Sequence, residues 1–306
     1  MFKLVCGAGN EDVESVKRLV YVYSSAGCKL FDISARKEIL AAAKEGAELA
    51  GAKGVKYCVS IGIKGDRHIS KADIDSEKCA CCGICVEVCP NDAILNKKSP
   101  EINTTRCIGC KKCFYRCPNR AINMKEKDID ASEILPYMVK NGVDFLELHI
   151  MGHDKSDLEK KWKMVNDCNP KFASICIDRE NFGNKECLDR IREMISVRDP
   201  FTTIVQADGI PMSGGDDSFK TTLQAVAMAE IVQNANLPVY IMLSGGTNSK
   251  TAALAKQCGI NYWGIAIGSW ARKIVKEYVK QPDFWDNKDA QTKAIEKAKS
   301  LIITCV

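Results

Sequence analysis

The sequence lacks the motifs that mark several common enzyme and membrane classes. It has only three histidines in 306 residues, namely His68, His149 and His153, and it contains no nucleophile elbow, Walker loop or dinucleotide-binding fingerprint. No apolar run is long enough to span a bilayer, and the first residues lead directly into a strand-like segment where a signal peptide would need a longer apolar region. These absences predict a cytoplasmic protein with no membrane span.

A strong excess of one charge is also missing. The chain carries 44 lysines and arginines against 39 acidic residues, a net charge of +5. This surplus is too small to imply a nucleic-acid partner. Hydrophobic residues make up 46% of the chain, as in an ordinary globular protein.

Cysteine, in contrast, is abundant, with 17 residues, and it is concentrated in two similar runs. The first run is Cys79-x-x-Cys82-x-x-Cys85-x-x-x-Cys89-Pro90, and the second is Cys107-x-x-Cys110-x-x-Cys113-x-x-x-Cys117-Pro118. Each run has the spacing that holds a cubane iron–sulfur cluster, and the pair is the pattern of bacterial two-cluster ferredoxins. Two zinc sites are the alternative, which the proline after each fourth cysteine disfavours.

In the two-cluster pattern the fourth cysteine of each run ligates the other cluster. We therefore assign Cys79, Cys82, Cys85 and Cys117 to one [4Fe–4S] cluster, and Cys107, Cys110, Cys113 and Cys89 to the other. Cys81 does not fit this pattern. It is a bystander, unless a slipped loop lets it replace Cys82.

The other cysteines are scattered without a pairing pattern. Cys6, Cys58 and Cys176 lie in apolar segments, which predicts buried free thiols in a reducing compartment. Basic residues outnumber acidic ones around the cysteine runs, so this region would attract an anionic donor, acceptor or cofactor. The donor and acceptor proteins are not identified by the sequence.

Outside the cysteine region, short apolar strands alternate with amphipathic helices. Eight strands are predicted at residues 2–6, 29–33, 57–63, 145–150, 172–177, 203–206, 239–243 and 262–267. Helices are predicted at residues 11–26, 36–50, 131–141, 157–167, 185–197, 220–235, 249–258 and 271–280, with a covering helix near 287–306. Eight such units predict an α/β fold, a (β/α)8 TIM-like barrel, and an open doubly wound sheet is the alternative.

The cysteine runs fall between the third strand and its helix. We therefore predict a barrel with an inserted two-[4Fe–4S] ferredoxin domain: residues 1–70 form the first part of the barrel, 71–127 the insert, and 128–306 the second part with the C-terminal helix. Loops that follow barrel strands emerge on the face where ligands bind. The clusters would consequently lie over the barrel mouth.

Two glycine-bearing loops at this face predict a site for a phosphate group. The seventh strand is followed by Gly245, Gly246 and Thr247, and the eighth by Gly268 and Ser269. Glycines let backbone N–H groups approach a phosphate, and the helix starts add positive dipole ends. Flavin mononucleotide (FMN), a sugar phosphate and a nucleotide all fit, whereas tight turns alone would also explain the glycines.

The loop after the sixth strand supplies two polar candidates, Asp208 and Ser213, which would orient a substrate or ligand. The alternative is that this loop is a mobile lid whose acidic side chains are exposed to solvent. Asp32, His149 and Asp178 also fall near strand ends. A histidine with apolar neighbours, such as His149, is more often a core residue than a catalytic base.

Several segments together resemble the LdpA family of iron–sulfur proteins. The resemblance rests on both cysteine runs and on the segments FKLVCGA at 2–8, QADGIPMSG at 206–214, SGGTN at 244–248 and GSWAR at 268–272. It implies two bound iron–sulfur clusters and a redox-sensing or electron-transfer role, without a defined catalytic mechanism. The family is linked in cyanobacteria to redox input to the circadian clock, but Cys81 and the lysine-rich composition depart from its pattern, so a clock role is not transferred.

Two functions follow. The first is an electron-transfer or redox-sensing protein whose clusters sit over a barrel ligand site. The alternative is an oxidoreductase in which the clusters pass electrons to a flavin or phosphate-bearing substrate at the barrel mouth.

Overall fold

Eight parallel strands close into a barrel in the computed structural model, which describes residues 1–66, 69–127, 129–210 and 215–305. Around the barrel the strands run in the order β1-β12-β11-β10-β9-β8-β3-β2. Their bounds are β1 (Phe2–Val5), β2 (Leu30–Ser34), β3 (Lys56–Gly62), β8 (Phe145–His149), β9 (Phe172–Ile177), β10 (Thr203–Asp208), β11 (Tyr240–Ser244) and β12 (Gly264–Ile267). The predicted (β/α)8 fold is confirmed, and the open doubly wound sheet is excluded.

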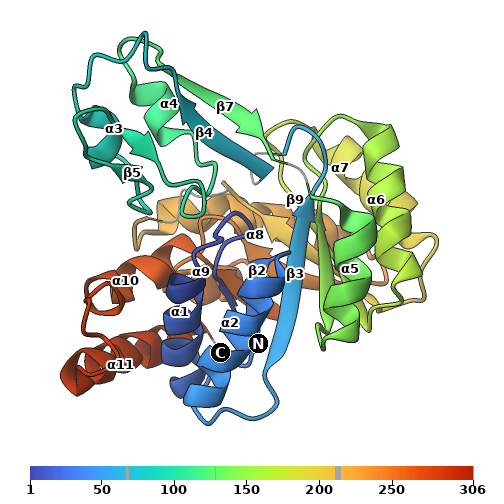
Figure 1. The fold of residues 1–306 in the computed structure, drawn as a ribbon. Helices are drawn as coiled ribbons and strands as arrows, with labels where there is room; N and C mark the ends of the chain where they lie inside the picture. The colour runs from blue at the N-terminus through green and yellow to red at the C-terminus, as the bar shows by residue number, and fades with distance from the viewer. Residues whose placement is uncertain (67–68, 128, 211–214, 306) are drawn as a thin grey trace.

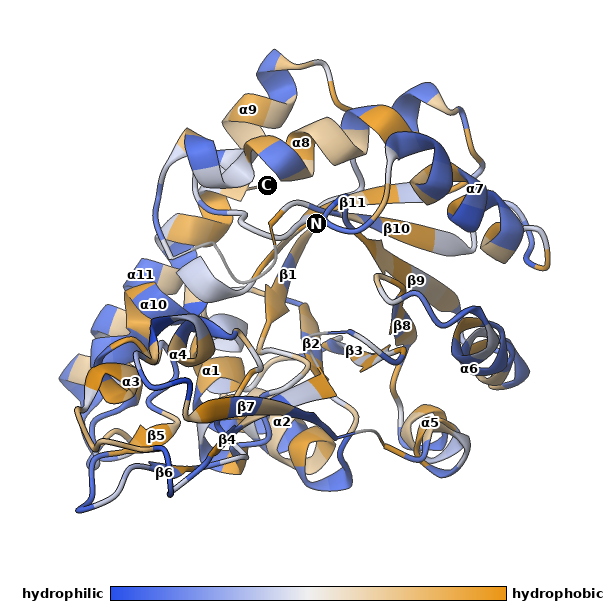
Figure 2. Ribbon diagram, turned by 90° about the horizontal axis from the view of Figure 1, so that it is seen from above, coloured by the Kyte–Doolittle hydropathy of each residue, from blue (hydrophilic) through white to orange (hydrophobic). Residues whose placement is uncertain are grey.

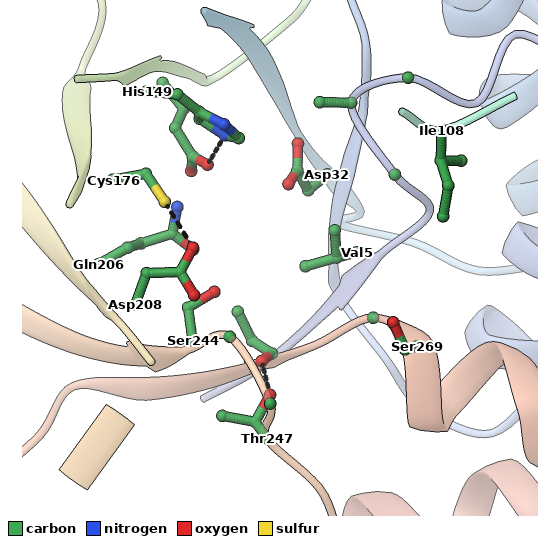
Figure 3. Close-up of a pocket in the computed structure, with 18 of the residues that line it drawn as sticks. Val5, Asp32, Ile108, His149, Cys176, Gln206, Asp208, Ser244, Thr247 and Ser269 are labelled. Carbon is green, nitrogen blue, oxygen red and sulfur yellow. Dashed lines mark hydrogen bonds and ion pairs between the residues drawn. The ribbon is translucent and has the colours of Figure 1, made fainter. Parts of the chain in front are cut away.

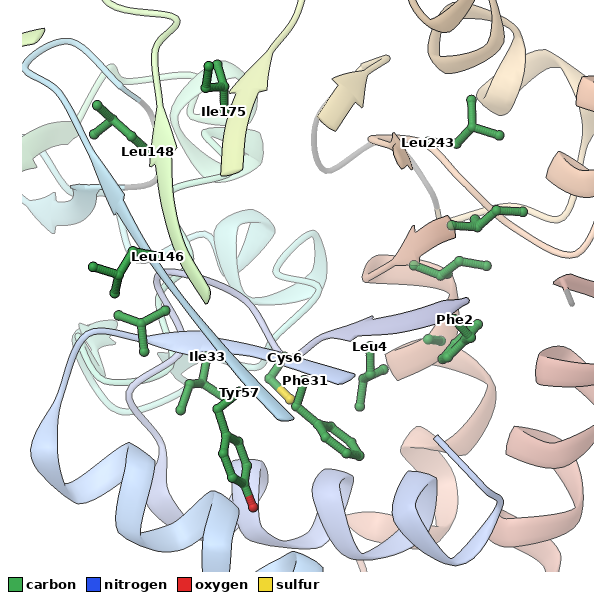
Figure 4. Packing of buried hydrophobic residues seen from close by; sticks show 14 of the residues in the cluster. Phe2, Leu4, Cys6, Phe31, Ile33, Tyr57, Leu146, Leu148, Ile175 and Leu243 are labelled. Carbon is green, nitrogen blue, oxygen red and sulfur yellow. The ribbon is translucent and has the colours of Figure 1, made fainter. Parts of the chain in front are cut away.

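The barrel strands are buried on both faces, which explains their continuous apolar sequences. Residues such as Leu4, Ile33 and Leu146 point outward and pack under the helices, as Figure 4 shows for part of this cluster. The alternate residues, including Leu30 and Phe145, form a separate cluster inside the barrel. The two-residue period of a strand therefore divides the core into an outer and an inner part.

Helices surround the barrel, as seen from above in Figure 2. They are α1 (Val13–Ser25), α2 (Lys37–Leu49), α5 (Ala131–Lys140), α6 (Lys155–Asp167), α7 (Asn184–Ile195), α8 (Phe219–Asn234), α9 (Thr251–Gln257), α10 (Ser269–Val279) and α11 (Lys288–Cys305). Aspartate N-caps start three of them: Asp12 accepts from the Ser15 N–H, Asp130 from Ser132 and Asp154 from Asp157. The last helix, α11, packs on α1 and α10, as expected of a covering helix.

The cysteine region leaves the barrel after β3 and returns before α5, and it lies above the barrel at the side of α1, α2 and α10 (Figures 1 and 2). It contains β4 (Ser70–Ile74), α3 (Ile84–Glu87), β5 (Ile94–Leu95), β6 (Glu101–Ile102), α4 (Lys112–Arg116) and β7 (Ile122–Glu126). Strands β4 and β7 pair antiparallel, as do β5 and β6. We call this region the insert and keep the predicted bounds 71–127 for it, with β4 beginning one residue earlier, at Ser70.

Aromatic side chains close the N-terminal end of the barrel. Phe145 stacks on Phe172 with ring centroids 5.4 Å apart, and Phe172 contacts Tyr240 and Trp263 at 6.1 and 6.5 Å. All four lie at or just before the first residue of a barrel strand. Among the described residues, the pocket that reaches the barrel interior lies at the C-terminal ends of the strands, where the insert lies.

Most predicted bounds differ from the observed ones by one or two residues. The largest consequence is in β10, which continues to Asp208, so this residue belongs to the strand and not to the loop. Ser213 and His68 lie outside the described residues. Among the described residues, no helix has the length and apolar character needed to cross a membrane.

Candidate functional site

The cysteines of the insert form two groups, each lining its own cavity. Cys89, Cys107, Cys110 and Cys113 line one cavity, and we call them the inner cysteine set. Cys79, Cys82, Cys85 and Cys117 line the other, and we call them the outer cysteine set. In each set, three cysteines come from one run and the fourth from the other run. The structure therefore brings together the same four residues that the spacing rule had grouped.

The two loops repeat one backbone conformation. The residue two positions after the first cysteine has a positive φ in both, at Cys81 (φ 53°) and Gly109 (φ 72°). The residue after the second cysteine does so too, at Gly83 (φ 78°) and Lys111 (φ 59°). These turns wrap the loop around its cavity. Cys81 thus occupies the left-handed position that a glycine fills in the other loop, and its side chain is exposed and does not line the outer cavity.

Each set has donors and packing suited to an iron–sulfur cluster. Backbone N–H groups of Ala93 and Ala121 donate to the sulfurs of Cys89 and Cys117, both at 3.2 Å. Hydrogen bonds of this kind tune a cluster's reduction potential. Burial, followed by the neighbouring thiols, raises the pKa of Cys113 to about 12. Four thiols this close become thiolates together only when cations compensate their charge, so the donor set fits a metal cluster.

The inner cysteine set faces the barrel, and the outer set faces away from it. Cys107 and Cys113 are buried, whereas Cys82 of the outer set is exposed. Ile108, directly after Cys107, lines both the inner cavity and the pocket at the barrel mouth.

The pocket at the barrel mouth is lined by residues from most barrel strands (Figure 3). Its lining includes the predicted residues Asp208, Gly245, Gly246, Thr247, Gly268 and Ser269. Gly245 and Gly246 have φ angles of 65° and 76°, which favour glycine, and Gly268 caps the start of α10. The Thr247 hydroxyl donates to the Ala266 carbonyl at 2.5 Å and so fixes this loop to β12.

A network of buried charges lies in the barrel, and three of its members, Asp32, Glu147 and His149, line this pocket. Lys3 Nζ lies 2.7 Å from Glu147 Oε2 and 3.7 Å from Asp32 Oδ2. His149 lies between two carboxylates, 3.0 Å from Glu147 Oε1 and 3.3 Å from Asp66 Oδ2. These charges compensate one another, as buried charges must.

The network shifts the pKa of its members in opposite directions. Burial alone would raise the pKa of Glu147, but the Lys3 ammonium and His149 outweigh it and hold this pKa well below its usual range. Burial alone would lower the pKa of His149, but hydrogen bonds and charges from Asp66 and Glu147 raise it well above 6.5. The raised pKa favours the charged form of His149, a buried core residue whose two ring nitrogens each face a carboxylate.

A second polar group lies on the neighbouring strands. Cys176 Sγ lies 3.2 Å from Asp208 Oδ2 across β9 and β10. The amide oxygen of Gln206, whose residue is 1% exposed, has no hydrogen-bond partner among the described residues. Because an unpaired buried polar atom is unfavourable, a ligand with an N–H or O–H donor would suit this position.

Glu147, His149 and Cys176 place one donor atom each within 4.8 Å of one another, a spacing that could hold a metal ion. Lys3 already neutralises Glu147, and its ammonium would repel a divalent cation. The arrangement therefore favours an organic ligand above the charge network over a metal ion within it.

Sequence reasoning missed Lys3, Glu147, Gln206 and Arg272 as pocket or network residues. Arg272 lines the pocket and donates from Nη1 to the Val5 carbonyl at 2.7 Å. A signal did exist, because Lys3 and Glu147 are charges in the middle of strands that are otherwise apolar. Of the other candidates, Asp32 joins the network, whereas Asp178 is buried but does not line the pocket.

Comparison with known proteins agrees with both parts of the chain. The 4Fe-4S binding domain family matches residues 100–123, within the insert. The family described as the light dependent period A C-terminal domain matches residues 137–305. A 4Fe–4S binding domain joined to a closed parallel barrel defines an iron–sulfur redox or electron-transfer protein.

The chain is also 30% identical over 294 residues to light dependent period A of Synechococcus elongatus, covering 91% of this chain and 82% of that protein. The chain belongs to the light dependent period A family.

Solved structures give weaker similarities. A truncated 3-deoxy-D-arabino-heptulosonate 7-phosphate synthase from Thermotoga maritima is 12% identical, with a TM-score of 0.49 over 99% of this chain and 84% of that chain. Orotidine 5'-phosphate decarboxylase from Pyrococcus horikoshii OT3 is also 12% identical, with a TM-score of 0.42 over 98% and 99% of the two chains. These values carry no functional assignment.

Proposed function

We propose that this protein binds two [4Fe–4S] clusters and transfers or senses single electrons above a ligand site in the barrel. Cys79, Cys82, Cys85 and Cys117 would hold the outer cluster, and Cys107, Cys110, Cys113 and Cys89 the inner one. When bound, such clusters each accept and release one electron. The residues proposed to hold them lie in the insert, for which residues 71–127 remain our proposed bounds, between barrel parts 1–70 and 128–306.

Ile108 is the observation on which this proposal depends most. It follows the inner ligand Cys107 and lines the barrel pocket as well as the inner cavity. An electron on the inner cluster would therefore reside next to the ligand pocket. The outer cluster, with the exposed Cys82, would exchange electrons with a partner protein in a reducing compartment such as the cytoplasm.

The exposed face of α4 suits an acidic electron-carrier protein as the donor or acceptor. Phe114 and Tyr115 are exposed on this helix and pack edge to face, with ring centroids 5.3 Å apart. Lys112 and Arg116 are exposed beside them. Aromatic anchors with basic neighbours favour docking of an acidic surface, which would increase the association rate at low salt.

Anaerobic purification followed by iron, sulfide and EPR analysis tests the two-cluster proposal. The wild type should contain about eight iron atoms, and Cys117→Ser and Cys89→Ser should each lose about half of the iron and a different EPR signal. Cys81→Gly is the matched control, because glycine suits the left-handed backbone there, and both signals should remain. Zinc in place of iron, or loss of the same signal in both serine variants, would contradict the assignment.

The alternative function is an oxidoreductase that passes cluster electrons to a flavin or phosphate-bearing substrate. The unpaired Gln206 oxygen and the glycine loops in one pocket favour it. Gly245, Gly246, Thr247, Gly268 and Ser269 would hold the phosphate, with Asp208 and Ser213 orienting the reacting end. A flavin spectrum that survives acid release of the iron would support this function, whereas an extract without any organic cofactor would favour the relay.

A further inference from the structure

Lys71 forms a direct connection between the insert and the barrel mouth. It lies on β4, it is only 6% exposed, and its ammonium donates two hydrogen bonds to backbone carbonyls. One acceptor is Gly9 at 2.6 Å, in the loop after β1, and the other is Cys107 at 2.7 Å, in the inner cysteine set. Glu11 lies 3.9 Å from the same ammonium.

The two carbonyl acceptors of Lys71 belong to different sites, the barrel pocket and the inner cysteine set. Gly9 lines the barrel pocket, and Cys107 lines the inner cavity. The N–H of Ala72, the residue after Lys71, donates to the Cys107 sulfur at 3.3 Å. Lys71 and Ala72 of β4 therefore contact both the backbone carbonyl and the sulfur of Cys107, a proposed cluster ligand. Lys71 also contacts Gly9 in the wall of the pocket.

The charge environment differs between the two cysteine sets. Beside the inner set, the Lys71 ammonium is buried, so solvent screens it weakly. Beside the outer set, Lys78 is exposed and pairs with Asp75 at 2.8 Å, so its charge is largely screened. The inner cavity also shares Ile108 with the pocket, whereas the outer cavity shares no lining residue with it among the described residues, so a charge in the pocket would affect the inner set far more than the outer one.

The pocket has features suited to an anion with a hydrogen-bond donor. The glycine loops and the start of α10 present backbone N–H groups, and Arg272 lies in the same lining. Independently, the buried Gln206 oxygen needs a donor. A phosphate-bearing molecule with an N–H or O–H group could bind the glycine loops through its phosphate and donate a hydrogen bond to the Gln206 oxygen.

We propose that Lys71 couples the inner cysteine set to the barrel pocket, so that the pocket binds a phosphate-bearing anion more tightly when the inner cluster is oxidised than when it is reduced. This proposal rests on the proposed binding of two clusters. Reduction adds one electron from a one-electron donor protein, without making or breaking a bond. The added negative charge on the inner cluster repels the anion in the pocket. Lys71 is the positioning residue, because it fixes Cys107 of the inner set relative to Gly9 of the pocket.

The difference in anion affinity can be measured as a change in reduction potential, because the two are thermodynamically linked. An anion that binds the oxidised form more tightly must lower the inner cluster's reduction potential by the same free energy. A tenfold difference in affinity corresponds to about 59 mV for a one-electron couple. The outer potential should remain constant.

The first test is an EPR-monitored redox titration of the wild type in potassium phosphate, compared with potassium chloride of equal ionic strength. The Cys117→Ser protein, which lacks an outer ligand, identifies the inner signal. We expect phosphate to move only the inner potential, to a more negative value. Equal potentials in both salts, or an equal shift of both clusters, would overturn the proposal.

The second test compares Lys71→Met and Lys71→Arg with Lys125→Met. Lys125 is an exposed lysine on the paired strand β7 that contacts Asp73. Lys71→Met should lower the inner potential in chloride and reduce the phosphate-dependent shift, Lys71→Arg should restore much of both, and Lys125→Met should change neither. A phosphate shift of wild-type size in Lys71→Met would overturn the role of Lys71.

The first test uses no Lys71 variant, so the coupling stays testable if Lys71→Met fails to fold. Iron and sulfide analysis distinguishes a failure of the two-cluster proposal from a failure of the coupling alone. A wild type with about four iron atoms would contradict the two-cluster function. A wild type with about eight iron atoms and no phosphate effect would contradict only the coupling.

Discussion

Lys3 is an unusual residue for the interior of a barrel, because transfer of an isolated ammonium out of water is strongly unfavourable. The structure compensates it with Glu147 and Asp32, and Ser60 donates to Asp32 at 2.6 Å. The network leaves the middle of the barrel polar and ordered beneath the pocket. Asp32, Glu147 and His149 also line the pocket, so the network forms part of its floor.

Replacement of Glu147 by glutamine should destabilise the protein by about 3–5 kcal/mol, because Lys3 and His149 would remain as buried charges without a carboxylate between them. The measurement is urea denaturation at neutral pH. Glu45→Gln is the matched control, since Glu45 also pairs with a lysine, Lys17, but at the exposed surface. That change should cost about 1 kcal/mol or less. Similar losses in both variants would contradict the buried network.

His149 should make stability depend on pH. Its folded pKa is raised above the unfolded value of about 6.5, so the folded state holds a proton that the unfolded state releases. The stabilisation is complete below about pH 6.5 and is lost as pH rises through the raised folded pKa. In denaturant titrations, the difference in unfolding free energy between the wild type and His149→Asn should therefore decrease as the pH rises above about 6.5. A difference that stays constant as the pH rises would contradict a raised pKa of His149 in the folded protein.

The loop between β11 and α9 depends on glycine for two separate reasons. Gly245 has a φ of 65°, and a Cβ there would overlap the Asp208 carboxylate and the Gly209 backbone. The close approach lets the glycine loop and the end of β10 line the same pocket. This element consequently links the predicted phosphate loop to the polar floor.

The comparison of Gly245→Ala with Gly259→Ala separates these reasons. Gly259 has nearly the same φ, 67°, but open space around the position of a Cβ. Both variants should lose about 1–2 kcal/mol from left-handed strain, and Gly245→Ala should lose about 1–3 kcal/mol more from overpacking. Unfolding free energies measure the difference. Equal losses would show that contact with Asp208 is unimportant.

The insert has a much smaller apolar core than the barrel. Its buried cluster consists of Ala72, Ala93, Ile94, Cys107, Cys113 and Ile122. Polar contacts attach it to the barrel: Arg106 pairs with Asp12 at 2.6 Å, and Lys276 pairs with Asp92 at 3.1 Å. A single apolar core supplies little stability in domains below about 70–80 residues, and small natural proteins often add a metal or disulfides. Every cysteine of the chain is free, so a metal is the remaining candidate.

Removal of iron should therefore loosen the insert before the barrel. After anaerobic treatment with a chelator, amide hydrogens of residues 71–127 should exchange much faster, whereas β8 to β11 should keep their protection. Hydrogen exchange followed by mass spectrometry measures this by segment. Unfolding of both regions together, or no change in the insert, would contradict a metal-dependent insert on a self-sufficient barrel.

The sequence by itself determined the eight strand-and-helix units and favoured a barrel, whereas the closed strand order that excludes an open doubly wound sheet came from the structure. It also determined the grouping of the eight insert cysteines, since their spacing dictates which thiols can meet around one cavity. Cys6, Cys58 and Cys176 were predicted as buried free thiols, and this is confirmed. These features are local or periodic, so they can be recognised without coordinates.

Only the tertiary structure decided which polar residues meet. Lys3 lies 144 positions from Glu147 in the chain, and β10 had to extend to Asp208 before that carboxylate could approach Cys176. The contact of Lys71 with Gly9 and Cys107 likewise joins three separate segments. The reason is physical: closing the barrel places distant strands side by side, and burial then selects the charge pairs that compensate one another.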